Sequence, residues 1–176
     1  AYYGESFGNT LQTDAGKYKD VKGEVIIGTF DFDYKGYNWI VRGNADYGYL
    51  GDAAAISDYN RIQSSTSPYK RTLVGKNAVS AGIEAGYDIF SRFNKLRGEQ
   101  KMYIFGRYEY YDAYVPVSGY REYSWTNRKR MAVGLNYYPI KDIVVKAEYS
   151  KRFFKSQYND EPSFSLGIAY AGFFNL

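Results

Sequence analysis

The sequence predicts an all-β protein: an antiparallel, up-and-down transmembrane β-barrel with about eight strands in this chain. Three observations lead to this prediction. Apolar and polar residues alternate along most of the chain, which is typical of β-strands with two chemically different faces. The connections between these stretches alternate between long and short, and aromatic rings gather at the strand ends. We expect one domain, 1–176, which is either a whole small barrel or the C-terminal half of a sixteen-stranded one.

The composition excludes most of the side chains that enzymes use for catalysis. The chain has no cysteine and no histidine, so it lacks disulfides, thiol nucleophiles, the usual general base and the commonest zinc ligand. We therefore expect no enzyme activity, no cofactor and no metal. A hydrolase built on a carboxylate pair such as Asp31 and Asp33 is the remaining enzymatic alternative, although inward acids more often line a lumen.

No run of 18 or more apolar residues is present, so we expect no membrane-spanning helix. The chain starts with "AYYGE" and shows no signal peptide, which suggests a mature or truncated form. The net charge of +4 is mild and fits either an anionic partner or an ordinary solvated surface.

Eight stretches have strand character, and the clearest lie within "RKRMAVGLNYYPIKDIVVKAEYSKRF" at 128–153. There, two alternating strands flank a Pro-containing turn at 139–142. A short helix is expected at 51–62, inside a connection. The full set of predicted strands is 1–8, 21–34, 38–49, 77–90, 99–112, 128–138, 143–153 and 163–176.

Long and short connections alternate along this order. Those at 35–37 and 139–142 are tight and that at 91–98 is moderate, whereas 9–20, 50–76, 113–127 and 154–162 are longer. Outer-membrane barrels have short turns on the periplasmic side and long loops outside. With an even strand count, both termini fall on the short-turn side.

The apolar face carries too many large rings to fit inside an eight-stranded barrel, so we expect it to face lipid. The opposite face is rich in small residues and in charges of both signs. For any single charge, pairing across neighbouring strands is more common than a role in selectivity. The predicted lumen-lining residues are Asp31, Asp33, Arg42, Asp46, Glu84, Asp88, Arg107, Glu109, Arg130, Lys146, Glu148 and Arg152.

The rings on the apolar face also predict where the membrane interfaces lie. In 38–49 the order is Trp39, then small and aliphatic residues, then Tyr47 and Tyr49. Tyr and Trp favour such interfaces, whereas β-propensity alone explains rings in strands but not their clustering at the ends. The predicted interface aromatics are Trp39, Tyr47, Tyr49, Tyr87, Tyr108, Tyr110, Tyr137, Tyr149, Tyr170 and Phe174.

Two segments, "FGRYEYYDAY" (105–114) and "RMAVGLNYYPIKDIVVKAEYSKR" (130–152), resemble the last strands of the phosphate-selective porin family. The resemblance implies a trimeric, sixteen-stranded channel roughly twice as long as this chain. It also implies anion selectivity through ladders of Arg and Lys. Here the basic lumen candidates are matched by acids, and the last residue is Leu176 instead of the terminal Phe typical of many assembly signals, although Phe174 keeps an aromatic on the lipid face.

The sequence leaves several functions open. The first is an outer-membrane porin or channel segment for passive diffusion of small hydrophilic or ionic solutes. The second is a complete eight-stranded structural or adhesion barrel with a packed interior and no pore. A soluble nucleic-acid or ligand barrel is a further alternative, but the chain lacks a basic cluster.

We expect the outer membrane of a Gram-negative-type bacterium as the location. Expected partners are outer-membrane lipid and lipopolysaccharide, with a homo-oligomer (a trimer if the chain is a porin) or other outer-membrane proteins, and no nucleic acid. Loop 50–76 is the candidate for a constriction or an exposed recognition surface. The acidic "YNDEP" at 158–162 is a weak signal for a divalent cation or a lipopolysaccharide contact.

Overall fold

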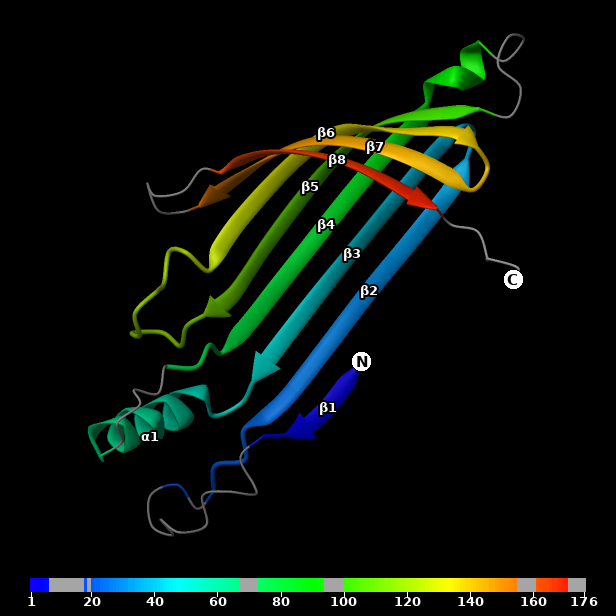
Figure 1. Ribbon diagram of the computed structural model, residues 1–176. Helices are drawn as coiled ribbons and strands as arrows, with labels where there is room; N and C mark the ends of the chain where they lie inside the picture. The colour runs from blue at the N-terminus through cyan, green and yellow to red at the C-terminus, as the bar shows by residue number, and fades with distance from the viewer. Residues whose placement is uncertain (7–17, 19, 67–72, 94–99, 155–160, 171–176) are drawn as a thin grey trace, which may run out of the picture. The chain divides into compact units, whose positions relative to one another are not determined.

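The computed structural model describes residues 1–6, 18, 20–66, 73–93, 100–154 and 161–170 (Figure 1). It is all-β, with one antiparallel up-and-down sheet in the order β1-β2-β3-β4-β5-β6-β7-β8. The sheet is not closed, so β1 and β8 are its edges. Among the described residues, no helix has both the length and the apolar character needed to cross a membrane.

The strands match the predicted stretches closely. One α-helix, α1 (Ala53–Thr66), lies in the connection where the sequence predicts it, and a 3₁₀-helix, η1 (Ile89–Arg92), follows β4. The strands are β1 (Tyr2–Glu5), β2 (Glu24–Gly36), β3 (Trp39–Leu50), β4 (Asn77–Asp88), β5 (Lys101–Val115), β6 (Asn127–Ile140), β7 (Ile143–Phe154) and β8 (Pro162–Tyr170).

Several strand boundaries differ from the prediction, and two of the differences have a clear cause. β5 continues to Val115, whose carbonyl accepts from Lys76 N (2.8 Å), and Pro116 follows it. Proline has no backbone donor for the next ladder bond. The turn expected at 139–142 is shorter, because β6 reaches Ile140 with a register shift between Tyr137 and Ile140. The shift absorbs Pro139 as a β-bulge. Residues 171–176, including Phe174, lie outside the described part.

The β2–β3 connection is a two-residue hairpin turn. Tyr37 and Asn38 both have positive φ, 50° and 66°. This is the pattern of a type I′ turn, whose twist matches that of the flanking strands, and Asn tolerates it well.

The chain divides into two compact units. The first comprises residues 1–30, 45–80 and 111–127, and the second comprises 31–44, 81–110 and 128–176. Strands β2 to β6 contribute residues to both units, β6 through Asn127 alone.

In the first unit, α1 supplies a small core. Ile56 and Tyr59 are buried and pack against Tyr18, Val21, Leu50 and Val74. The Ser57 side chain is fully buried, and its hydroxyl accepts from Val74 N (3.1 Å) and donates to Val74 O (3.4 Å). The predicted long loop 50–76 therefore contains a helix anchored to the chain that flanks it.

A second contact ties α1 to the β5–β6 connection. The Tyr120 hydroxyl donates to Asp58 Oδ1 (2.9 Å), and this hydrogen bond, with some desolvation, raises the pKa of Tyr120. Arg61 also pairs with Asp58 (2.8 Å). One carboxylate thus holds together two connections that are far apart in sequence.

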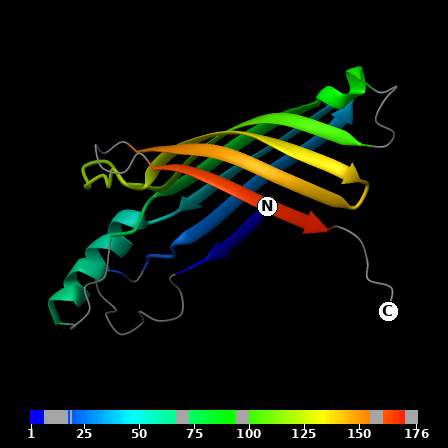
Figure 2. The same cartoon turned by 45° about the horizontal axis from the view of Figure 1, so that its top comes forward.

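In the second unit, β6, β7 and β8 lie side by side (Figure 2), and their register confirms the alternation of faces. Val133 pairs with Tyr149, which pairs with Phe164, and all three are exposed apolar side chains. One residue along, Gly134 pairs with Glu148, which pairs with Ser165. Rows of apolar side chains therefore alternate with rows of small and charged ones across three strands.

Phe105 is a large ring on the charged face of β5, and it is buried (7% exposed). Its neighbours across the sheet are glycines. A Cβ added at Gly134 would lie 2.6 Å from the Phe105 ring and in collision with Ala147 O, and one at Gly86 would lie 3.4 Å from Phe105 Cβ. Because glycine has no side chain, these positions leave space for the Phe105 ring against the sheet.

We expect Gly134→Ala to lower the free energy of unfolding by roughly 1–3 kcal/mol, because the ring and the β7 backbone must both move. Gly106→Ala is the matched control, since a Cβ there meets no atom within 4 Å. It should change stability by less than about 0.5 kcal/mol. Urea unfolding of both variants in detergent micelles measures the difference, and equal effects would contradict the packing described.

Candidate functional site

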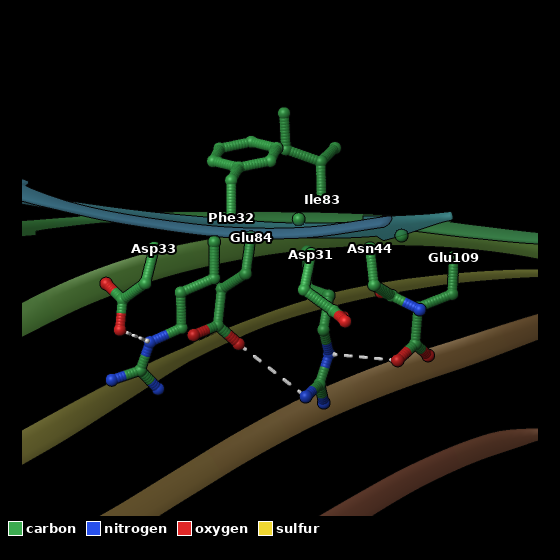
Figure 3. A pocket seen from close by; sticks show the side chains of 11 residues that line it. Asp31, Phe32, Asp33, Asn44, Ile83, Glu84 and Glu109 are labelled. Atoms are coloured by element: carbon green, nitrogen blue, oxygen red, sulfur yellow. Dashed lines mark ion pairs between the residues drawn. The ribbon is translucent and has the colours of Figure 1, made fainter. Parts of the chain in front are cut away.

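The candidate site lies on the charged face of the second unit. A hollow of about 540 Å³ opens on this face, and its lining includes backbone and side chains of β2 to β5. Figure 3 shows Phe32 and Ile83 on one side of the sheet and the charged side chains on the other. The lining residues are Asp31, Phe32, Asp33, Arg42, Gly43, Asn44, Gly82, Ile83, Glu84, Arg107 and Glu109.

Arg107 on β5 is the centre of an ion-pair network. Its Nη2 donates to Glu148 Oε2 on β7 (2.5 Å). Its guanidinium also lies 3.6 Å from Glu84 on β4 and 3.7 Å from Glu109 on its own strand. The last two distances exceed hydrogen-bonding range, so they are ion pairs without a direct hydrogen bond.

Arg130 on β6 extends the network. It donates to Glu148 Oε1 (2.7 Å), Glu109 Oε2 (3.3 Å) and Ser150 Oγ (3.2 Å). Glu148 therefore accepts from both arginines, one at each carboxylate oxygen. The five charges link four neighbouring strands, β4 to β7.

The network is only partly exposed. Both arginine side chains are 26% exposed and Glu148 is 18% exposed. The Nε atoms of both arginines are buried and have no hydrogen-bond partner among the described residues. Charges held this way are costly to separate, because a partly desolvated partner would remain.

A second set of charges lies on β2 and β3. Asp33 pairs with Arg42 Nε (3.5 Å) and Lys35 (3.4 Å), and these side chains are about half exposed or more. Asp31 lines the same hollow. Across the hollow and the network, the acids are Asp31, Asp33, Glu84, Glu109 and Glu148 and the bases are Arg42, Arg107 and Arg130.

The remaining predicted lumen residues lie apart from this network. Asp46, in the first unit, accepts from Ser80 Oγ (2.6 Å). Asp88 is buried, caps η1 through Phe90 N (3.1 Å) and also accepts from Met102 N (3.1 Å).

Two further predicted residues lie on β7. Lys146 pairs in register with Asn136 on one side and Gly167 on the other. Arg152 pairs with Glu161 (3.6 Å), both well exposed. Neither joins the network around Glu148.

The predicted interface aromatics lie on the opposite face. Trp39, Tyr47, Tyr108, Tyr149 and Tyr170 are exposed, whereas Tyr49, Tyr87, Tyr110 and Tyr137 are half-buried. Trp39 and Tyr87 are in ring contact, with centroids 5.0 Å apart. Arg92 lies over Tyr87, and a hydrogen bond to the Tyr87 hydroxyl raises the pKa of Arg92.

Sequence reasoning missed the grouping of Lys101, Tyr103, Tyr138 and Lys141 around Ile40. These residues line a separate hollow of about 520 Å³ on the charged face. The alternation places Lys101 and Tyr103 on that face. It does not say which residues of β3 and β6 lie beside them, because that depends on the pairing of the strands. Among the described residues, no group of three or more His, Cys, Asp or Glu is arranged to hold a metal ion.

Comparison with known proteins gives little to transfer. No family model matches the chain, and no solved structure matches it. It is 28% identical over 122 residues to an uncharacterized protein of Aquifex aeolicus (strain VF5). The match covers 66% of this chain and 27% of the relative, so the chain spans only about a quarter of that protein's length.

We expect Glu148→Gln to lower the free energy of unfolding by about 1–3 kcal/mol at neutral pH, because both arginines lose a charged acceptor. Glu161→Gln is the matched control: its ion pair with Arg152 is solvent-exposed and should be worth less than about 0.5 kcal/mol. Urea unfolding in micelles compares the two. Equal small losses would show that the network contributes no more than a surface pair.

Proposed function

We propose that the chain is a segment of an outer-membrane channel for passive diffusion of small hydrophilic or ionic solutes. In this proposal the apolar face of the sheet contacts lipid, the charged face lines a hydrated lumen, and the strands belong to a closed barrel. The resemblance to phosphate-selective porins, the location in a Gram-negative-type outer membrane and the lipid and lipopolysaccharide partners are parts of the same proposal.

The observation that carries the proposal is the inversion of the two faces. In the second unit, Val133, Leu166 and Ile168 are 59%, 72% and 78% exposed, whereas Arg107 and Glu148 on the other face are largely covered by their ion pairs. A soluble sheet buries its apolar face and hydrates its charged one. The arrangement here is the one expected where the apolar side meets hydrocarbon.

Topology supports the proposal independently. In an antiparallel meander, successive connections lie at alternate ends of the strands. Those of one set span residues 6–23, 51–76, 116–126 and 155–161, and those of the other span 37–38, 89–100 and 141–142. Two of the second set are two-residue turns, as in barrels with long loops on one side of a membrane.

The open sheet favours a larger barrel over a small closed one, since β1 and β8 remain edges. A specific observation nevertheless favours the second candidate, a packed eight-stranded barrel without a pore. The network around Arg107 and Arg130 would fill the interior of a small barrel with paired charges.

The two tryptophans provide a direct test of lipid contact. Trp39 lies on the apolar face and Trp125 lies in the β5–β6 connection, and both are about half exposed. In liposomes containing brominated lipid, Trp125→Phe protein, which keeps Trp39, should be quenched several-fold more than Trp39→Phe protein, which keeps Trp125. Equal or absent quenching in protein shown to be folded would contradict lipid contact by this face.

Conductance then separates the two barrels. We expect the chain, refolded into planar bilayers, to give large and long-lived current steps, because a wide barrel encloses an aqueous channel. Tryptophan quenching with no conductance would contradict the channel and favour the packed barrel.

A further inference from the structure

The hollow formed by Ile40, Lys101, Tyr103, Tyr138 and Lys141 has a composition unlike the rest of the charged face. It belongs entirely to the second unit and draws on β3, β5, β6 and the turn after β6. Its volume of about 520 Å³ is in the range of small-molecule sites. It is large enough for a single-ring organic solute.

Two tyrosines give the hollow an aromatic wall. The rings of Tyr103 and Tyr138 have centroids 6.0 Å apart and an interplanar angle of 83°, which is an edge-to-face contact. Together with Ile40 they offer apolar surface and an exposed π-face to a third ring. Ile40, Tyr103 and Tyr138 are each half-buried, so this wall is partly covered yet still reachable.

Two lysines give the hollow a positive charge that nothing in its lining neutralises. Lys101 and Lys141 are exposed, and neither forms an ion pair within the described part of the chain. The lining holds no acidic residue. This differs from Arg107 and Arg130, whose charges are held by three glutamates.

The acid that lines the neighbouring hollow is already engaged. Asp88 lines the neighbouring hollow, which shares Ile40, Lys101 and Tyr103 with this one. Its carboxylate is buried and accepts from two backbone N–H groups, those of Phe90 and Met102. It therefore acts as the cap of η1 and leaves the two lysines to face solvent.

From this juxtaposition we propose that the hollow is a binding site for a small organic anion with a flat apolar body, such as an aromatic carboxylate. The carboxylate lies between Lys101 and Lys141, and the ring rests against Tyr103, Tyr138 and Ile40. An inorganic anion meets only the lysines, and a neutral ring meets only the aromatic wall, so each should bind more weakly.

The inference deepens the proposed function, because it places a solute class on the face proposed as the lumen. Binding is measurable on protein folded in micelles, whether or not a current flows. The two proposals can therefore fail separately.

The test uses benzoate as the probe. Its binding is measured by saturation-transfer NMR and by calorimetry at about 0.15 M salt, where diffuse surface fields are screened. Saturable binding is expected for the unmodified chain. Lys101→Met/Lys141→Met should weaken it roughly tenfold or more, the loss expected when hydrogen bonds from charged donors disappear. Lys146→Met is the matched control, an exposed lysine outside the lining, and should change it less than about twofold.

The aromatic wall has its own variant. Tyr138→Leu keeps an apolar residue but removes one ring, and should weaken benzoate several-fold while leaving phosphate binding unchanged. Far-UV circular dichroism and urea unfolding confirm that each variant folds. If Tyr138→Leu does not fold, Tyr103→Leu provides the same comparison.

Three results would overturn the inference: phosphate binding as tightly as benzoate, benzyl alcohol binding as tightly as benzoate, or an equal loss in Lys146→Met. The first indicates a simple anion site, the second an apolar crevice and the third a diffuse field. Conductance without benzoate binding overturns the site alone. Benzoate binding without conductance supports the site and contradicts the channel.

Discussion

The contact on which the charged face depends is the bridge from Arg107 through Glu148 to Arg130. Each guanidinium takes one carboxylate oxygen of Glu148, at 2.5 and 2.7 Å, and Glu84 and Glu109 complete the arrangement. These side chains come from four strands, so the bridge fixes how β4 to β7 lie against one another. In a sheet with few buried apolar side chains, charged hydrogen bonds take over a role that packing has elsewhere.

The two faces of the sheet differ in chemistry. Side chains such as Phe30 and Phe164 are 64% and 67% exposed, which in water would leave most of their hydrophobic stabilisation unused. Arg107 and Arg130 on the charged face are largely covered by their acidic partners. Around it lie two different chemical regions: an acid-containing hollow near Asp31 and Asp33, and a basic, aromatic one near Lys101 and Lys141.

The strands and their alternating faces were predictable because a period of two is visible within each stretch of sequence. The pairing of charges was not. Arg107 meets Glu148 only because of the register between strands, which alternation leaves open, and Lys141 lines one hollow with Tyr103 for the same reason. Asp88 has the same place in the alternation as the other charged residues of its face, yet its side chain caps the 3₁₀-helix that begins at the next residue. The sequence predicted a turn at Pro139, because a proline interrupts a strand unless a β-bulge accommodates it. Whether a bulge forms depends on the pairing with the partner strand. Closure of the sheet is a property of its edges, which no single-strand pattern encodes.

The β8 edge has a kinetic consequence. All nine residues of this strand are exposed, and its pairing in the sheet is with β7 alone. In water, another extended chain can pair with such an edge strand. Burial of Leu166 and Ile168 against that chain would stabilise the pairing. Aggregation at this edge would compete with the transfer to lipid that the proposed function requires, so the time that a newly made chain spends in water becomes important.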